Sequence, residues 1–207
     1  MIVSMNSLDH ILFNWLAAGY QPQPQILLAA GGIATYSIGV VPLALLVTWI
    51  VRPEGRRAVL NAMLAGGLGL LAAKVLSAWI GRPRPFMIGL SPLYLPHAAE
   101  GSFPSAHASV MLAVSLCLLF SRRTRFAGGI LLLLGLITGW ARVYTGLHFP
   151  LDIVGAALLA AAIVWNLGPD GPQWIGALAA RADHCCAAIA GRWRLEERGR
   201  QLPPNRE

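Results

Sequence analysis

The sequence contains few charged residues. Asp, Glu, Lys and Arg make up 12% of the 207 residues, whereas hydrophobic residues make up 56% and the mean hydropathy is +0.60. Soluble domains usually carry about a quarter charged residues, and a monomer this apolar would expose large hydrophobic patches to water. The shortage of charge therefore excludes a typical soluble enzyme or a disordered tail, and it indicates a polytopic membrane protein.

Cysteine and acidic residues are also scarce. Two of the three cysteines, Cys185 and Cys186, are adjacent, which is poor geometry for a mutual disulfide. The nine Asp and Glu residues form no cluster that would hold Mg²⁺ or Ca²⁺. These shortages exclude a disulfide scaffold, and we expect neither a metal nor another cofactor.

The basic residues outnumber the acidic ones, which gives a formal net charge of +7. All of them except Lys74 are arginines, and they lie in short runs between apolar stretches and in the C-terminal tail. A nucleic-acid-binding protein would be expected to carry a continuous basic stripe, and the sequence has none. The pattern favours the positive-inside rule of membrane topology, and we expect no nucleic-acid partner.

Five long apolar segments predict an all-α fold, specifically a polytopic integral membrane helical bundle. A membrane span needs about 20 apolar residues, and no strand-like alternation competes with these runs. The predicted membrane domain covers residues 25–168. Its expected spans are 25–51, 58–80, 105–121, 126–147 and 151–168.

Two flanking segments complete the predicted domain organisation. In residues 1–24, apolar side chains recur at helical spacing, which predicts an amphipathic helix at the membrane interface. These side chains are Leu8, Ile11, Leu12, Trp15 and Leu16. Residues 169–207 are predicted to form an amphipathic cytoplasmic helix over 173–191, followed by a mobile tail.

The arginines between the spans predict the orientation of the bundle. With five spans, the connectors 52–57 and 122–125 and the tail all lie on one side of the membrane, and all three are rich in arginine. The positive-inside rule places that side, with the C-terminus, in the cytoplasm. The 81–104 loop then faces outward.

Three polar clusters occur at span ends, where such residues need a functional reason. GRPRPF (81–86) follows the second span, GSFPSAH (101–107) opens the third, and RVYTGLHFPLD (142–152) links the fourth to the fifth. The five-span topology places all three on the outer face, whereas random placement would scatter them over both faces. The clusters are therefore predicted to converge on one site.

The residue types in these clusters are those that handle phosphate. Arginine guanidinium groups match phosphate oxygens bidentately, and a serine hydroxyl and backbone N–H groups at a helix start add neutral donors. A histidine can attack phosphorus if a carboxylate holds its other ring nitrogen, and a second histidine can protonate the leaving oxygen. The candidates are His148, His107, Asp152, Ser105, Arg84 and Arg142.

The three clusters resemble the motifs of the type 2 phosphatidic acid phosphatase superfamily, which read Lys-x6-Arg-Pro, Pro-Ser-Gly-His and Ser-Arg-x5-His-x3-Asp. The third motif corresponds to residues 141–152, with Ala141 in place of the leading serine. The second corresponds to residues 104–107, with Ala106 in place of glycine. The combination, order and spacing of the motifs are specific for the superfamily.

The first motif departs from the family pattern. It retains Arg84-Pro85, but Ser77 stands where the family has lysine, and Lys74 lies one helical turn deeper. Lys74 is a candidate phosphate ligand that snorkels toward the site, or it plays no part. Arg82 is either a phosphate ligand or an interfacial anchor. The sequence around residues 96–107 resembles the undecaprenyl-diphosphate phosphatase branch, the type linked to bacitracin resistance, which often lacks the lysine.

The resemblance implies a role for each matching residue. His148 would attack the terminal phosphorus and form a phospho-histidine, Asp152 would orient and charge-stabilise its imidazole, and His107 would protonate the departing lipid phosphate. Water would then hydrolyse the intermediate without a metal. The groups implied to bind the phosphoryl group are the side chains of Arg84, Arg142 and Ser105 and the N–H of Ala106.

The resemblance also implies a substrate and a location. The substrate would be undecaprenyl diphosphate, hydrolysed to undecaprenyl phosphate and phosphate in the bacterial inner membrane, which recycles the lipid carrier of peptidoglycan synthesis. A phosphatidate or phosphatidylglycerophosphate phosphatase is an alternative, because the motifs define the headgroup chemistry and not the tail. A small membrane transporter or lipid-binding scaffold is an alternative of another class that would need no His–Asp pair.

Overall fold

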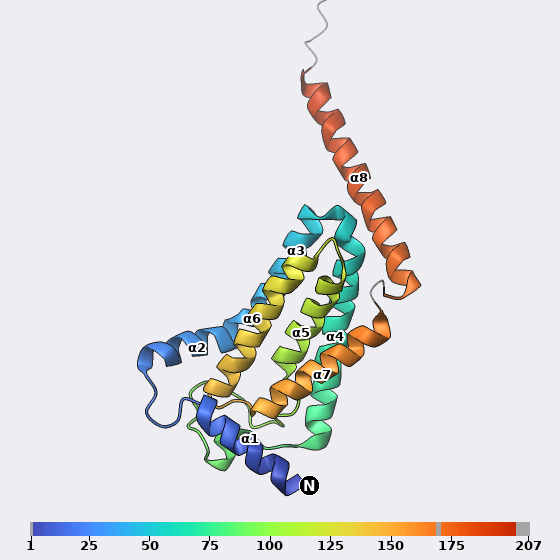
Figure 1. Ribbon diagram of the computed structural model, residues 1–207. Coiled ribbons are helices and arrows are strands. Elements are labelled where there is room, and N and C mark those ends of the chain that lie inside the picture. Colours follow the sequence, from blue (N-terminus) through green and yellow to red (C-terminus); the bar gives the residue numbers. More distant parts are fainter. Residues whose placement is uncertain (1, 169–170, 202–207) are drawn as a thin grey trace, which may run out of the picture.

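The computed structural model describes residues 2–168 and 171–201, and within these ranges it contains helices and no strand (Figure 1), which confirms the all-α prediction. The α-helices are α1 (Ile2–Leu16), α2 (Pro24–Tyr36), α3 (Val40–Val51), α4 (Arg56–Ile80), α5 (Ala106–Phe120), α6 (Arg125–Tyr144), α7 (Pro150–Leu167) and α8 (Gln173–Gln201). Short 3₁₀ turns cover Ser37–Gly39, Pro53–Gly55 and Pro85–Ile88.

The apolar runs form the expected spans. Four helical segments of the described chain are long and apolar enough to cross a membrane, namely Pro24–Val51, Pro53–Ile88, Arg125–Tyr144 and Pro150–Leu167. The shorter apolar helix α5 is the third of the five segments that the sequence predicts. The protein is therefore an integral membrane helical bundle.

The first span, predicted over 25–51, is bent. It consists of α2 and α3 joined by the 3₁₀ turn Ser37–Gly39, and α2 runs obliquely to α3 (Figure 1). Pro42, in the first turn of α3, has no N–H for the carbonyl four residues earlier, so the helix cannot continue undisturbed. This bend brings α2 alongside α6.

Helix α5 is the centre of the bundle, packed against α4, α6 and α7. Most of its residues are buried, including Met111 and Leu118 at 0% exposure. Small residues let α4 approach closely: a Cβ on Gly66 would lie 2.8 Å from Cγ2 of Val114, and one on Gly69 would lie 3.2 Å from the carbonyl oxygen of Ser109. Gly66 and Gly69 therefore allow close packing of α4 against α5.

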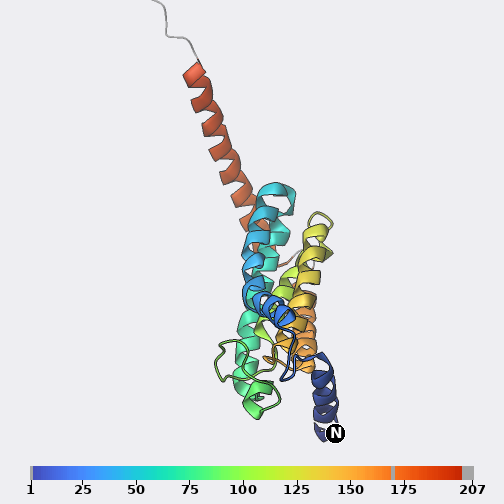
Figure 2. The ribbon, with the colours of Figure 1, turned by 90° about the vertical axis from the view of Figure 1, so that its left-hand side faces the viewer.

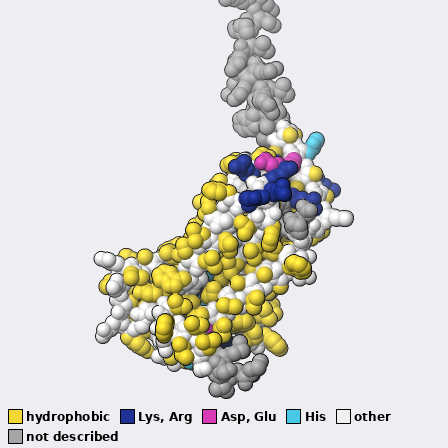
Figure 3. Space-filling view, in the orientation of Figure 1, with side chains coloured by type: hydrophobic (Ala, Val, Ile, Leu, Met, Phe, Trp, Pro, Cys, Tyr) yellow, Lys and Arg dark blue, Asp and Glu magenta, His cyan; other side chains and the backbone are white. Residues whose placement is uncertain are grey.

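Different helices, loops and turns lie at the two ends of the bundle (Figures 1 and 2). Helix α1, the loop 81–105 and the α6–α7 turn lie at one end, which we call the loop end. The α3–α4 turn, the α5–α6 turn and the base of α8 lie at the other, which we call the basic end. In Figure 3 the Lys and Arg side chains gather near the base of α8, above a flank covered mostly by hydrophobic side chains.

The predicted C-terminal helix forms, and it is longer than expected. Helix α8 runs from Gln173 to Gln201 and packs against α4. Nη1 of Arg56 lies 2.6 Å from Oδ1 of Asp183. Ten residues of the predicted mobile tail are helical, and the rest of that tail, residues 202–207, lies outside the described residues.

Helix α1 presents two different faces. The predicted apolar side chains are exposed, from 40% for Leu12 to 85% for Trp15. Asp9 and Phe13, which point the other way, are fully buried against the loop end of the bundle. Residues 2–16 form the helix, so it begins six residues before the apolar pattern that predicts it.

Candidate active site

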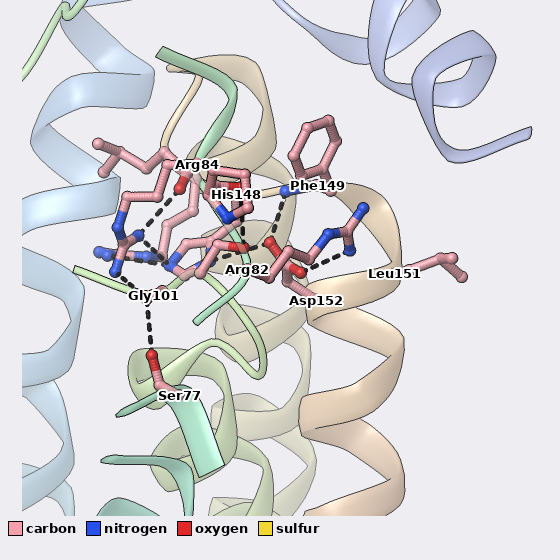
Figure 4. A network of polar contacts seen from close by, with 12 residues as sticks. Ser77, Arg82, Arg84, Gly101, His148, Phe149, Leu151 and Asp152 are labelled. Carbon is pink, nitrogen blue, oxygen red and sulfur yellow. Dashed lines mark hydrogen bonds and ion pairs between the residues drawn. The ribbon is translucent and has the colours of Figure 1, made fainter. Parts of the chain in front are cut away.

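The structure brings residues of all three polar clusters together at the loop end (Figure 4). Arg84 lies just beyond α4, Arg142 in the last turn of α6, and His148 in the turn between α6 and α7. Asp152 lies in the first turn of α7 and Ser105 directly before α5. All five side chains are buried, with exposures from 0% to 5%.

Local backbone signals position the His148–Asp152 pair. Gly146 adopts φ +74°, which lets the chain turn sharply after α6. Pro150 starts α7, and Asp152, three residues beyond Phe149, accepts a hydrogen bond from the Phe149 N–H at 2.8 Å. The carboxylate that caps the helix therefore also faces the histidine four residues before it in the sequence.

The hydrogen bonds of His148 define its tautomer. Nε2 lies 3.1 Å from Nη1 of Arg84 and 3.4 Å from Nη2 of Arg142. A guanidinium has no acceptor, so Nε2 must offer its lone pair and the proton of a neutral ring sits on Nδ1. Nδ1 lies 3.4 Å from Oδ2 of Asp152, too poorly aligned for a hydrogen bond. Burial, and then the charges of Arg142 and Arg84, lowers the pKa of His148 well below its ordinary value of 6.5, which keeps the ring neutral.

Backbone carbonyls hold Arg84 in place. Its Nε donates to the carbonyl of Glu100 at 3.1 Å, Nη1 to that of Leu147 at 2.9 Å and Nη2 to that of Gly101 at 3.0 Å. The same Gly101 carbonyl accepts the hydroxyl of Ser77 at 2.7 Å. Ser77, which stands at the family's lysine position, thus helps to fix the loop that anchors Arg84.

Arg142 is anchored in a similar way. Nη1 donates to the carbonyl of Ala34 in α2 at 3.0 Å, and Nη2 lies 3.3 Å from Nε2 of His97. Burial lowers the pKa of His97, so its ring nitrogen can accept this hydrogen bond. Within the described residues, neither Arg84 nor Arg142 has a carboxylate within salt-bridge distance. Neither arginine forms a direct ion pair with a carboxylate of the described chain, so their positive charges are available to an anion.

Besides Nδ1 of His148, two buried polar groups of the site residues have no hydrogen-bond partner in the described chain, namely Oγ of Ser105 and Nε of Arg142. Buried polar groups are normally paired, so these two require an explanation. Ser105 stands at the start of α5, where the backbone N–H of Ala106 adds another donor. Together they fit the oxygens of a phosphoryl group.

His107 is the second residue of α5 and is partly buried. It is close enough to Arg142, His97 and Arg84 to interact with them electrostatically. A role of His107 as the proton donor stays a prediction.

Two of the predicted phosphate ligands have carboxylate partners instead. The guanidinium of Arg82 donates to Oδ1 of Asp152 at 2.9 Å and to Asp9. Nζ of Lys74 lies 3.2 Å from Oε2 of Glu100, with more than half of each side chain exposed. The hydrogen bond from Lys74 lowers the pKa of Glu100. A phosphate role for these two residues stays a prediction.

Sequence reasoning missed residues of α1. Asp9 lies against Arg82, and the ring of His10, which no sequence pattern singles out, stacks 5.3 Å from the ring of Phe149. The one signal was an acidic residue within an otherwise apolar segment. Its partners are 73 and 142 residues away, so no local pattern identifies them.

Among the described residues, no group of three or more His, Cys, Asp or Glu side chains could hold a metal ion. The positive charge at the site comes from Arg84 and Arg142. A buried neutral histidine next to two such arginines, in a bundle that spans the membrane, defines a membrane-embedded phosphatase.

Comparison with known proteins gives the family. Residues 57–169 match the model of the PAP2 superfamily, and the chain belongs to that superfamily. This confirms the resemblance seen in the sequence motifs, and the protein is an integral membrane lipid phosphatase.

Two relatives are bacterial. Undecaprenyl-diphosphatase BcrC of Bacillus subtilis is 36% identical over 132 residues, which are 63% of this chain and 67% of the relative. Putative undecaprenyl-diphosphatase YbjG of Escherichia coli is 32% identical over 169 residues, which are 78% of this chain and 85% of the relative.

Solved structures share the fold. LpxE of Aquifex aeolicus superposes with a TM-score of 0.59 at 27% identity, over 73% of this chain and 89% of that chain. A PAP2-type phosphatidylglycerolphosphate phosphatase of Bacillus subtilis superposes with a TM-score of 0.59 at 23% identity, over 79% of this chain and 84% of that chain, and this likeness is one of fold.

Proposed function

We propose that this protein hydrolyses undecaprenyl diphosphate to undecaprenyl phosphate and inorganic phosphate through a phosphorylated His148. The observation that carries the proposal is the geometry of that histidine: Nε2 faces two buried arginines at 3.1 and 3.4 Å, and Nδ1 faces a carboxylate. The names of the two bacterial relatives support the choice of substrate.

In the first step, Nε2 of His148 attacks the terminal phosphorus. The bond from that phosphorus to the bridging oxygen breaks, and His107 gives a proton to the oxygen that leaves with the lipid phosphate. The guanidinium groups of Arg84 and Arg142 then donate to the phosphoryl oxygens instead of to Nε2. They stabilise the negative charge of those oxygens, and this stabilisation supplies most of the catalysis. Oγ of Ser105 and the N–H of Ala106 add neutral donors.

In the second step, water attacks the phosphorus and the P–N bond breaks. His107, now neutral, takes the proton of the water, and His148 returns to its starting form with free phosphate as the product. The imidazole carries positive charge while it is phosphorylated, so the carboxylate of Asp152 beside Nδ1 stabilises the intermediate.

The site lies at the outer surface of the membrane in this proposal. The arginine-rich connectors and α8 lie at the opposite end of the bundle, and the positive-inside rule assigns that end and the C-terminus to the cytoplasm. A prenyl tail can then remain in the bilayer between helices while its diphosphate reaches the arginines. The exposed apolar face of α1 fits an interfacial helix at the same surface.

A phosphate-release panel tests the function. Purified protein is incubated in EDTA with undecaprenyl diphosphate, shorter prenyl diphosphates, phosphatidate and phosphatidylglycerophosphate. We expect the fastest release from undecaprenyl diphosphate and none from the folded His148→Ala variant. Faster release from the glycerolipid phosphates would overturn the substrate, strict metal dependence would contradict the mechanism, and full activity of the variant would overturn the nucleophile.

A further inference from the structure

Asp9 in α1 is a buried carboxylate outside every sequence motif that defines the site. Its side chain has 0% exposure. Oδ1 accepts a hydrogen bond from the N–H of Leu151 at 3.0 Å, at the start of α7, and Oδ2 accepts one from Nη2 of Arg82. Both oxygens are therefore in use, and both contacts lead to the segment that carries Asp152.

Arg82 links the two carboxylates. Its Nη1 donates to Oδ1 of Asp152 at 2.9 Å (Figure 4). Its Nη2 donates to Asp9, and its guanidinium lies 4.3 Å from the centroid of the Phe149 ring. Oδ2 of Asp152 is the oxygen that faces Nδ1 of His148. A continuous chain of contacts thus runs from the N-terminal helix to the nucleophile.

Helix α1 also packs on the residue that follows the nucleophile. The ring of His10 lies 5.3 Å from that of Phe149, nearly parallel to it, and the ring of Phe13 lies 5.4 Å away. Phe149 donates its backbone N–H to Asp152. Apolar packing and the Asp9 hydrogen bonds therefore hold the same short stretch of backbone.

The charges along this chain set the field at His148. The ionisable groups around that ring are Arg84, Arg142 and Asp152, with His97 nearby. Asp152, Arg82 and Asp9 carry a formal sum of −1, whereas Asp152 and Arg82 alone would carry zero. With Asp9 present, Arg82 is shared between two carboxylates, so Asp152 keeps more negative potential toward the imidazole that becomes cationic.

We propose that Asp9 is a positioning residue of this phosphatase, which acts through Arg82 to aim Asp152 and to preserve its negative potential toward His148. The proposal rests on the proposed function of His148 as the nucleophile. It makes α1 part of the catalytic apparatus, although Asp9 itself contacts neither the phosphoryl-binding groups nor the histidine.

The test compares Asp9→Asn with the wild type in the full-length protein, with undecaprenyl diphosphate as the probe. The variant keeps the shape of the side chain and removes its charge. We expect kcat to fall roughly tenfold or more, because small displacements of a catalytic group cost on this order. KM should stay within twofold, and the acid limb of the kcat–pH profile should move to lower pH because a negative charge is lost near His148.

Arg82→Gln is the second variant, and it gives the opposite sign. It removes a positive charge from the same chain, so the acid limb should move to higher pH while kcat falls. This variant carries the test if Asp9→Asn does not fold. Loss of an ordinary structural contact would not produce pH shifts in opposite directions.

Asp183→Asn is the matched control. It removes the charge of an aspartate that lies 2.6 Å from an arginine at the basic end, and it should leave kcat and the pH profile unchanged. If folded Asp9→Asn has the kcat and the acid limb of the wild type, and differs from it at most by a lower melting temperature, the inference is overturned and the proposed function remains intact. Absence of phosphate release by the wild type would overturn the proposed function, and the inference with it.

Discussion

The two ends of the bundle use arginine in different ways. At the loop end, Arg84 and Arg142 are 5% and 3% exposed, and they donate to backbone carbonyls and to His148. At the basic end, the arginines in the connectors are mostly exposed, among them Arg52, Arg122, Arg123 and Arg125. Burying an ion costs several kcal/mol, so a buried arginine without a carboxylate partner indicates that an anion completes its site. An exposed arginine needs no such partner, and its charge can set the orientation of the protein in the membrane.

The largest loss of kcat is expected for a substitution of Asp152, the carboxylate that faces His148 at the loop end. Asp152→Asn keeps the side-chain shape, and its amide oxygen can still cap α7, but the negative charge beside Nδ1 of His148 is lost. By analogy with carboxylate-oriented histidines, kcat should fall on the order of a thousandfold. Phosphate release at saturating substrate measures it, and a loss below tenfold in a protein with a wild-type melting curve would contradict the assigned role.

A smaller effect is expected when a buried arginine becomes lysine. Arg84→Lys keeps the positive charge but cannot reproduce the three carbonyl contacts or the flat donor geometry that fits phosphate. We expect kcat/KM to fall roughly a hundredfold. Phosphate release with circular dichroism as a check on folding measures this, and activity within threefold of wild type would show that charge alone suffices.

The pH dependence should reflect the burial of His148. Its pKa lies well below 6.5 because burial disfavours the charged ring, and a nucleophile must be unprotonated to react. As the pH falls through 6.5, kcat should therefore stay level and decrease only at lower pH, where the imidazole becomes protonated. A kcat–pH profile measures this, and an acid limb at or above 6.5 would conflict with the buried neutral imidazole.

The smallest effect is expected at the basic end. Arg123→Lys retains the charge of an exposed side chain that donates to the carbonyl of Glu54 at 3.1 Å, far from the site. This variant is the matched partner of Arg84→Lys, and its kcat/KM should stay within twofold of wild type. The same phosphate-release assay measures both, and an equal loss in the two variants would remove the distinction between the ends.

Much of the fold could be predicted from the sequence because long apolar runs have few alternatives to membrane helices. Arginines, prolines and glycines mark the helix ends, and α4 stops at Gly81, which adopts φ +61°. The topology alone placed the three polar clusters at one end. The residues of the third motif, from Arg142 to Asp152, are close in sequence, so their proximity follows from a single turn between two helices.

Other features depended on contacts between distant segments. To predict the break between α2 and α3, Pro42 has to be recognised as a helix disruption and not as one more apolar residue. One carboxylate partner of Arg82 is Asp9, 73 residues away, and that of Lys74 is Glu100, 26 residues away. No local sequence pattern identifies either partner. A charged side chain on a span end can face a phosphate or a carboxylate, and only the tertiary structure distinguishes the two.

Trapping of the phosphorylated enzyme tests whether His148 is the nucleophile. Undecaprenyl diphosphate labelled in its terminal phosphate is mixed with enzyme, the reaction is stopped in alkali, in which phospho-histidine survives, and the labelled peptide is identified by mass spectrometry. We expect acid-labile label on His148 and none in His148→Ala. Label on another residue, or phosphate release at the full rate with no labelled enzyme at any time, would contradict this assignment.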